Sequence, residues 1–118
     1  MQIIMRKIDE LIPYEKNPRL NDNAVSACAE SIRQYGFRVP IIVDRNGVIV
    51  AGHTRHKAAK MLGLANVPVV VADDLTDEQI QAFRLADNKV ADLSIWDNRL
   101  LLEELAEIES YGLDLFTG

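Results

Sequence analysis

The chain has 118 residues, of which 48% are hydrophobic and 26% are charged, and these are the proportions of one globular domain with a single core. Its formal net charge of -5 argues against broad, sequence-independent binding of duplex DNA, although a local basic patch is compatible with it. No apolar run is long enough to span a membrane and the start lacks a signal-peptide pattern, so we expect a cytoplasmic protein without a membrane partner.

A strand and a helix are predicted in the N-terminal third of the chain. Residues 2–8 can form the strand, and the helix is expected from about residue 23 to residue 35. Apolar side chains recur there at i, i+3, i+4 and i+7, which is one face of a helix: Val25, Cys28, Ala29 and Ile32. Gly36 suits the end of this helix. Cys28 is the one cysteine of the chain, so it can form no internal disulfide and is expected to be a buried structural thiol.

A hairpin, a helix and a further strand are predicted in the middle of the chain. Two short apolar runs flank Asp44–Gly47, where Asn46-Gly47 is a strong signal for a hairpin turn. An alanine-rich helical pattern follows over about residues 54–62 and is ended by Gly63. The valine-rich stretch "NVPVVV" then predicts a strand. The predicted order in this part of the chain is strand, strand, helix, strand.

Two helices are predicted in the C-terminal third. Thr76–Gln79 has the spacing of a capping box, so a helix is expected to start there and to run toward Asp87-Asn88. A last helix is expected over about residues 98–110, and the chain stops soon after it at "YGLDLFTG". We therefore expect one domain over residues 1–95, followed over residues 96–118 by a C-terminal helix and the start of a linker to a missing domain.

The stretch "IVAGHTRHKAAKMLG" runs from a predicted strand into a predicted helix through Gly52. The first turn of a helix has free backbone N–H groups and the positive end of the helix dipole, and both favour an anion. A glycine lets the anion approach the backbone without a Cβ in the way. Gly52 is followed by five side chains that can donate to an anion: a hydroxyl, two imidazoles, an ammonium and a guanidinium. The guanidinium can bind two phosphate oxygens at once, so the turn is typical of a phosphate-binding site. These groups belong to His53, Thr54, Arg55, His56 and Lys57.

A plainer interpretation of the same stretch is that its basic residues lie in water and that Gly52 only serves a tight turn. Short motifs match often by chance, so the spacing alone leaves the two interpretations about equal. Basic residues at a helix N-terminus oppose the helix dipole, and this mild cost favours a functional role. Two histidines three residues apart, His53 and His56, lack a third firm ligand, so we expect no zinc.

Several short motifs follow one another in a fixed order along the chain. They are Asn17-Pro18, Ser31-Ile32, Gly36 with Pro40-Ile41, Gly52 with Arg55 and Ala58, Val67-Pro68, and Asp87-Asn88. In this order they resemble the amino-terminal domain of the ParB family, which shares its fold with sulfiredoxin. The resemblance extends from Ile8 to about Asp92, and that coverage makes it far more specific than any one of the motifs.

Three longer segments are similar to a subgroup of this family. "VAGHTRHKAA", "ADDLTDEQIQAFRLADNKVADLSIWD" and "LDLFTG" resemble the ParB-like domain at the front of phage and prophage DNA methylases. In those proteins a similar domain precedes a methyltransferase. The 118 residues contain no methyltransferase motif, so the resemblance implies a DNA-modifying partner domain and assigns no methyl transfer to this chain.

The resemblance also implies a ligand and a set of site residues. In partition proteins this domain binds cytidine triphosphate with magnesium, so a nucleoside triphosphate of the CTP or ATP type with Mg²⁺ is implied here. Gly36 through Pro40 would lie near the base and sugar, and Asp87 and Asn88 near the metal or the phosphates. The residues expected at the phosphates are Arg19, Gly52, His53, Thr54, Arg55 and His56.

The chain departs from the partition proteins at two places. They usually have Gly-Glu-Arg-Arg where this chain has Gly52-His53-Thr54-Arg55, and an arginine three residues after the acidic-Asn pair, where this chain has Ala91. The loss of the acidic residue and of two arginines weakens the case for triphosphate hydrolysis. Sulfiredoxins carry a cysteine at the position of His53, so this chain lacks the nucleophile of a sulfinic-acid reductase.

We therefore expect an α/β (α+β) domain of the ParB/sulfiredoxin-like fold, with a small mixed sheet flanked by helices. Its expected function is nucleotide or phosphate binding in a DNA-associated protein that reaches DNA through a fused or associated domain, such as a DNA modification methylase, as a monomer or a homodimer. One alternative is a nucleotide hydrolase, kinase or nuclease that uses the same pocket. Another is an interaction domain with a vestigial pocket.

Overall fold

The computed structural model of the chain describes residues 2–15, 22–93 and 98–111, and within them an α+β fold with a four-stranded mixed sheet. The elements in chain order are β1 (Ile3–Lys7), the 3-10 helix η1 (Ile8–Glu10), α1 (Asp22–Tyr35), β2 (Ile41–Val43), β3 (Ile49–Ala51), α2 (His53–Met61), β4 (Asn66–Val71), α3 (Asp77–Leu93) and α4 (Asn98–Ser110). None of the helices in these described ranges has the length and apolar character needed to cross a membrane.

The sheet has the strand order β1-β4-β2-β3. The first strand pairs antiparallel with β4, from Ile3 opposite Val70 to Lys7 opposite Asn66. The strands β2 and β4 run parallel, and β2 and β3 form an antiparallel hairpin. The predicted mixed sheet is therefore confirmed, with the expected first strand ending one residue earlier, at Lys7, where η1 begins.

The hairpin turn forms because Asp44 and Gly47 supply what a tight turn needs. The Asp44 carboxylate oxygen Oδ1 accepts hydrogen bonds from the backbone N–H groups of Asn46 at 2.8 Å and Val48 at 3.0 Å. Gly47 has a φ of 84°, which is costly for a residue with a side chain. The hairpin predicted from Asn46-Gly47 is thus confirmed, and it aligns β3 so that its last residue leads directly into α2.

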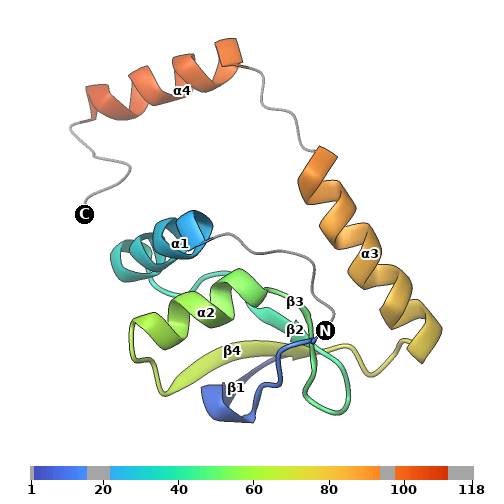
Figure 1. The fold of residues 1–118 in the computed structure, drawn as a ribbon. Coiled ribbons are helices and arrows are strands. Elements are labelled where there is room, and N and C mark those ends of the chain that lie inside the picture. The colour runs from blue at the N-terminus through green and yellow to red at the C-terminus, as the bar shows by residue number, and fades with distance from the viewer. Residues whose placement is uncertain (1, 16–21, 94–97, 112–118) are drawn as a thin grey trace.

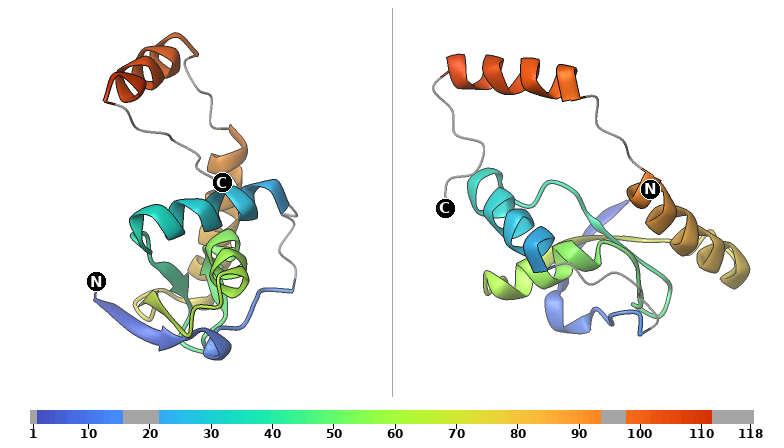
Figure 2. Two further views of the ribbon diagram at one scale, coloured as in Figure 1. Left: turned by 90° about the vertical axis from the view of Figure 1, so that its left-hand side faces the viewer. Right: turned by 45° about the horizontal axis from the view of Figure 1, so that its top comes forward.

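The core lies between the sheet and α2. Its most deeply buried side chains come from β2, β3 and β4: Ile41, Val43, Ile49, Val67 and Val69. In α2, Ala58 and Ala59 are fully buried, and such small side chains allow close approach of a helix to its neighbours. Figures 1 and 2 show α2 over the sheet with α1 beside it, and Ala58 packs with Val25 and Ala29 of α1.

The helix α3 starts at the predicted capping box. The backbone N–H of Gln79 donates to Thr76 Oγ1 at 3.2 Å, and the Gln79 side-chain oxygen accepts from the Thr76 N–H at 2.9 Å. The helix was expected to end near Asp87-Asn88, but it continues to Leu93 because residues 77–93 include no glycine or proline. Buried Ile80 lies in this helix, which contacts β3.

Candidate functional site

The turn between β3 and α2 has the geometry of an anion-binding turn. Gly52 has φ 104° and ψ 26°, in the left-handed region, and stands at the N-cap position of α2. Gly52 has no side chain with which to cap the helix, and the first helical hydrogen bond is that from the His56 N–H to the Gly52 carbonyl, 3.0 Å. The N-cap residue therefore leaves the backbone N–H groups of the first turn available to an anion.

A small cavity of about 110 Å³ opens beside this turn. It is lined from three elements by Cys28, Ser31, Ile32, Tyr35, Gly36, Phe37, Arg38, Val39 and Arg55. The fold thus brings Arg55 of α2 to the segment after α1 that contains Gly36. Pro40, also expected there, is half-buried and does not line the cavity.

Cys28 is a thiol at the wall of this cavity rather than a nucleophile. Burial raises the pKa of Cys28, and the positive charge of Arg55 only partly opposes this shift. A cysteine whose pKa is raised carries little thiolate at neutral pH and reacts slowly. Cys28 is half-buried, so the expectation of a buried structural thiol is confirmed in part.

His53 is the first residue of α2 and is held as a neutral ring. Its Nε2 accepts a hydrogen bond from the backbone N–H of Tyr14, 3.1 Å away. Burial is the main cause that lowers the pKa of His53 to about 4, with further contributions from His56, Arg84 and Lys57. At neutral pH the turn therefore contains a neutral imidazole at the first residue of α2.

Arg84 of α3 lies against β3, the strand that leads into the turn, and against Tyr14, which contacts His53. Its Nε donates to the carbonyl of Ile49 at 3.3 Å, its Nη2 lies 3.7 Å from Asp44 Oδ2, and its Cζ lies 4.0 Å from the centre of the Tyr14 ring. Sequence reasoning missed both Arg84 and Tyr14. The one available signal was the position of Arg84 four residues after Ile80, on the face of the helix that packs against the sheet.

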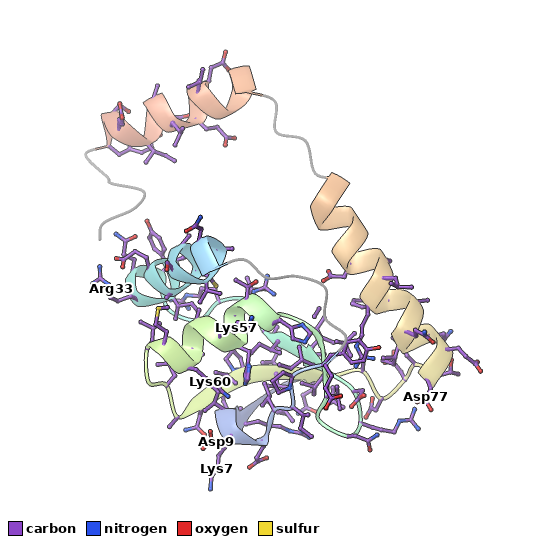
Figure 3. All side chains as sticks on the ribbon, in the orientation of Figure 1. Lys7, Asp9, Arg33, Lys57, Lys60 and Asp77 are labelled. Atoms are coloured by element: carbon purple, nitrogen blue, oxygen red, sulfur yellow. The ribbon has the colours of Figure 1, made fainter. Side chains whose placement is uncertain are left out.

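His56 lies on the inner side of α2. Its side chain is 2% exposed, and among the residues that the structure describes its Nε2 has no hydrogen-bond partner. Burial lowers the pKa of His56, Lys60 adds to the shift, and the backbone of Ile8 opposes it. His56 belongs to the core beneath η1, whereas Lys57 and Lys60 point outward from the same helix (Figure 3).

The other residues expected at the site, Asp87, Asn88 and Arg19, make no described contact with the turn between β3 and α2. Asp87 is exposed on α3, and for Asn88 the structure describes the helical backbone alone. Arg19 lies outside the described residues. Within residues 2–15, 23–87 and 102–111, no three His, Cys, Asp or Glu side chains come together as a metal site would require.

The model of the ParB N-terminal domain family matches residues 2–89 of the 118. The chain belongs to the ParB N-terminal domain family. The ParB-like nuclease domain-containing protein YnaK of Escherichia coli is 44% identical over 82 residues, which are 69% of this chain and 94% of that protein. The probable chromosome-partitioning protein ParB of Rickettsia typhi is 29% identical over 116 residues, and the chain spans 40% of the length of that ParB.

Solved structures share the ParB fold of this chain. The C-terminally truncated ParB of Caulobacter crescentus complexed with CTP-γ-S has a TM-score of 0.73 at 24% identity, over 97% of this chain and 67% of that one. Sulfiredoxin from Arabidopsis thaliana has a TM-score of 0.59 at 23% identity, over 70% of this chain and 97% of that one. A free serine kinase in complex with AMP has a TM-score of 0.54 at 25% identity, over 64% of this chain and 32% of that one. The expected ParB/sulfiredoxin-like fold is confirmed.

Proposed function

We propose that this domain binds a nucleotide, with the phosphates at the turn between β3 and α2. The observation that carries the proposal is the uncapped helix start at Gly52, which adjoins a cavity lined by Arg55. Outward-facing N–H groups and a guanidinium are the donors that phosphate oxygens need. Thr54, half-buried in the same turn, adds a hydroxyl donor.

The segment after α1 is proposed to receive the base or sugar. Gly36 and Val39 line the cavity together with Phe37, whose ring offers an apolar surface for a base. Related folds support this choice of ligand, because two of the structures named above, the ParB and the free serine kinase, were solved with CTP-γ-S and with AMP. Arg19, which lies outside the described residues, would add a further phosphate contact.

Binding rather than turnover is the proposed activity. Among the groups of the turn, His53 uses Nε2 to accept a hydrogen bond, so this nitrogen is not free to act as a general base. Arg55 carries a positive charge and cannot take up a proton. A nucleotide hydrolase, kinase or nuclease would need a base from outside this turn, and the exposed carboxylate of Asp87 is the candidate.

Magnesium is proposed to arrive with the nucleotide. Mg²⁺ commonly keeps several waters and is held by phosphate oxygens with one or two carboxylates. Asp87 could supply such a carboxylate and Asn88 a carbonyl oxygen. The described residues provide no metal site of their own, so the phosphates would be the main ligands.

The proposed biological setting is a DNA-associated protein. The chain's similarity to the chromosome-partitioning protein ParB supports it, and the resemblance to the domain that precedes prophage DNA methylases suggests a methyltransferase as the fused or associated partner. With a net charge of -5, the domain would reach DNA through that partner, as a monomer or a homodimer.

Calorimetric titration with each of the four ribonucleoside triphosphates, with and without Mg²⁺, tests the proposal. We expect saturable binding of at least one triphosphate that Mg²⁺ strengthens and that Arg55→Ala removes. No binding of any nucleotide by the folded chain would overturn the proposal and favour an interaction domain with a vestigial pocket. Release of phosphate during the titration would instead favour the hydrolase.

A further inference from the structure

A continuous series of contacts connects α3 with the first residue of α2. It starts at Arg84, whose guanidinium is held at three points: by the Ile49 carbonyl, by the Asp44 carboxylate and by the face of the Tyr14 ring. The Arg84 side chain is 13% exposed, so water screens these contacts little. A guanidinium fixed in this way holds the Tyr14 segment against β3 and α3.

The Tyr14 backbone then fixes the ring of His53. Because the Tyr14 N–H can only donate, His53 Nε2 must be the unprotonated nitrogen that accepts this hydrogen bond. A neutral imidazole with an accepting Nε2 carries its proton on Nδ1. The backbone contact at Tyr14 therefore selects one of the two neutral tautomers of His53.

We propose that Arg84 and Tyr14 are positioning residues for the anion-binding turn: they hold His53 neutral with its proton on Nδ1, so that the first residue of α2 offers a donor to phosphate. The inference rests on the proposed nucleotide site. An unprotonated ring nitrogen facing a phosphate would repel it, whereas an Nδ1–H can donate to it.

Two further observations support a role for this series beyond stability. The Nη2 of Arg84 is buried, and its ion-pair partner Asp44 Oδ2 lies 3.7 Å away, beyond hydrogen-bond distance. Stability alone disfavours a buried donor without a hydrogen bond to the described residues. Burial, with smaller contributions from His56, Arg84 and Lys57, also opposes protonation of His53 and lowers its pKa to about 4. The same tautomer is therefore kept over the whole neutral range of pH.

The test compares two pairs of variants of the full chain. Arg84→Gln removes the guanidinium that stacks on Tyr14. Arg45→Gln is its matched control, because Arg45 is exposed and its hydrogen bond among the described residues goes to the Leu75 carbonyl at 3.0 Å. Tyr14→Leu removes the aromatic ring, and its control Tyr14→Phe keeps the ring and removes only the hydroxyl. Each protein is measured by ¹⁵N NMR of the His53 ring nitrogens and by calorimetric titration with a nucleoside triphosphate and with inorganic phosphate.

We expect the parent, Arg45→Gln and Tyr14→Phe to keep the proton of His53 on Nδ1. In Arg84→Gln and Tyr14→Leu the ring should become a mixture of tautomers, and nucleotide affinity should fall roughly threefold to tenfold. A parent protein with the His53 proton on Nε2 would overturn the inference whatever the affinities are.

The remaining outcomes separate the inference from the proposed function. If the tautomer changes in both variants while the affinity stays at the parent value and Arg55→Ala still loses binding, the positioning role is overturned and the nucleotide site stands. If the parent binds neither nucleotide nor phosphate, the proposed function fails and the positioning role fails with it. The NMR result would then still report whether Tyr14 sets the tautomer of His53.

Discussion

A Cβ atom added to Gly52 would lie 3.3 Å from the Cα of Ile41. Ile41 is the first residue of β2 and is fully buried, so its backbone cannot yield without disturbing the parallel pairing with β4. The turn that starts α2 is thus packed directly on the sheet. This close approach, together with a φ of 104°, leaves glycine as the fitting residue at this position.

Gly52→Val should lower the free energy of unfolding by about 2–4 kcal/mol, because the strain of a positive φ adds to the overpacking against Ile41. Thermal melts with and without nucleoside triphosphate measure both stability and binding. Gly63→Val is the control, since Gly63 has a φ of 72° but open space around its Cβ position. Equal melting temperatures for the two variants, each raised by nucleotide, would show that the Gly52 turn is not the site.

Arg55→Ala should weaken binding of the nucleoside triphosphate while the fold stays intact. A charge-assisted hydrogen bond to phosphate contributes about 1.5–3 kcal/mol, so the dissociation constant should rise roughly tenfold or more. Titration calorimetry measures this change, and circular dichroism checks the fold. Arg45→Ala, which removes an exposed arginine that does not line the cavity, should bind like the parent. Unchanged affinity in Arg55→Ala would remove this residue from the site.

Stability should decrease on mild acidification. The pKa values of His53 and His56 are lowered in the folded chain, that of His53 from 6.5 to about 4, so the unfolded chain binds more protons in this range. The stabilisation is complete above pH 6.5 and is lost as the pH falls toward 4. Melting temperatures between pH 7.5 and pH 5 measure the slope, which should be shallower in His53→Gln. A flat profile for the parent would contradict the neutral, buried state of both rings.

Thr76→Ala should destabilise the start of α3 by about 1 kcal/mol, because it leaves the N–H of Gln79 without its capping oxygen. Thr76→Ser keeps the hydroxyl and should retain most of the stability. Chemical denaturation of the three proteins measures the difference. Equal losses in the alanine and serine variants would point to the methyl group of the threonine and away from the cap.

Local signals in the sequence predicted the elements well where one or two residues decide the backbone. Asn46-Gly47 predicted the hairpin, and Gly36 and Gly63 predicted the ends of two helices, because left-handed or tight turns favour these residue types. The end of α3 was misjudged since Asp87-Asn88 tolerates a helix when no glycine or proline follows. An asparagine within a helical pattern does not by itself end the helix.

The candidate site was predictable only in part, because contacts between distant residues leave no local pattern. Gly52 and Arg55 were expected from the strand–glycine–helix order, whereas Tyr14 and Arg84 meet across 70 positions of the chain. His56 was grouped with His53 by its spacing. It instead lies in the core, because the rotation of α2 against η1 decides which side of the helix is covered.

The place of β4 in the sheet sets the order in which the chain can fold as it is synthesised. This strand is the last of the four to leave the ribosome, yet it lies between β1 and β2 and joins them. Until it emerges, β1 has no neighbour in the sheet and the edge of β2 that β4 later covers is unpaired, which invites pairing with other chains. A translational pause before β4 has left the ribosome would prolong this exposure, whereas a pause after β4 has left it would leave time for the sheet to close.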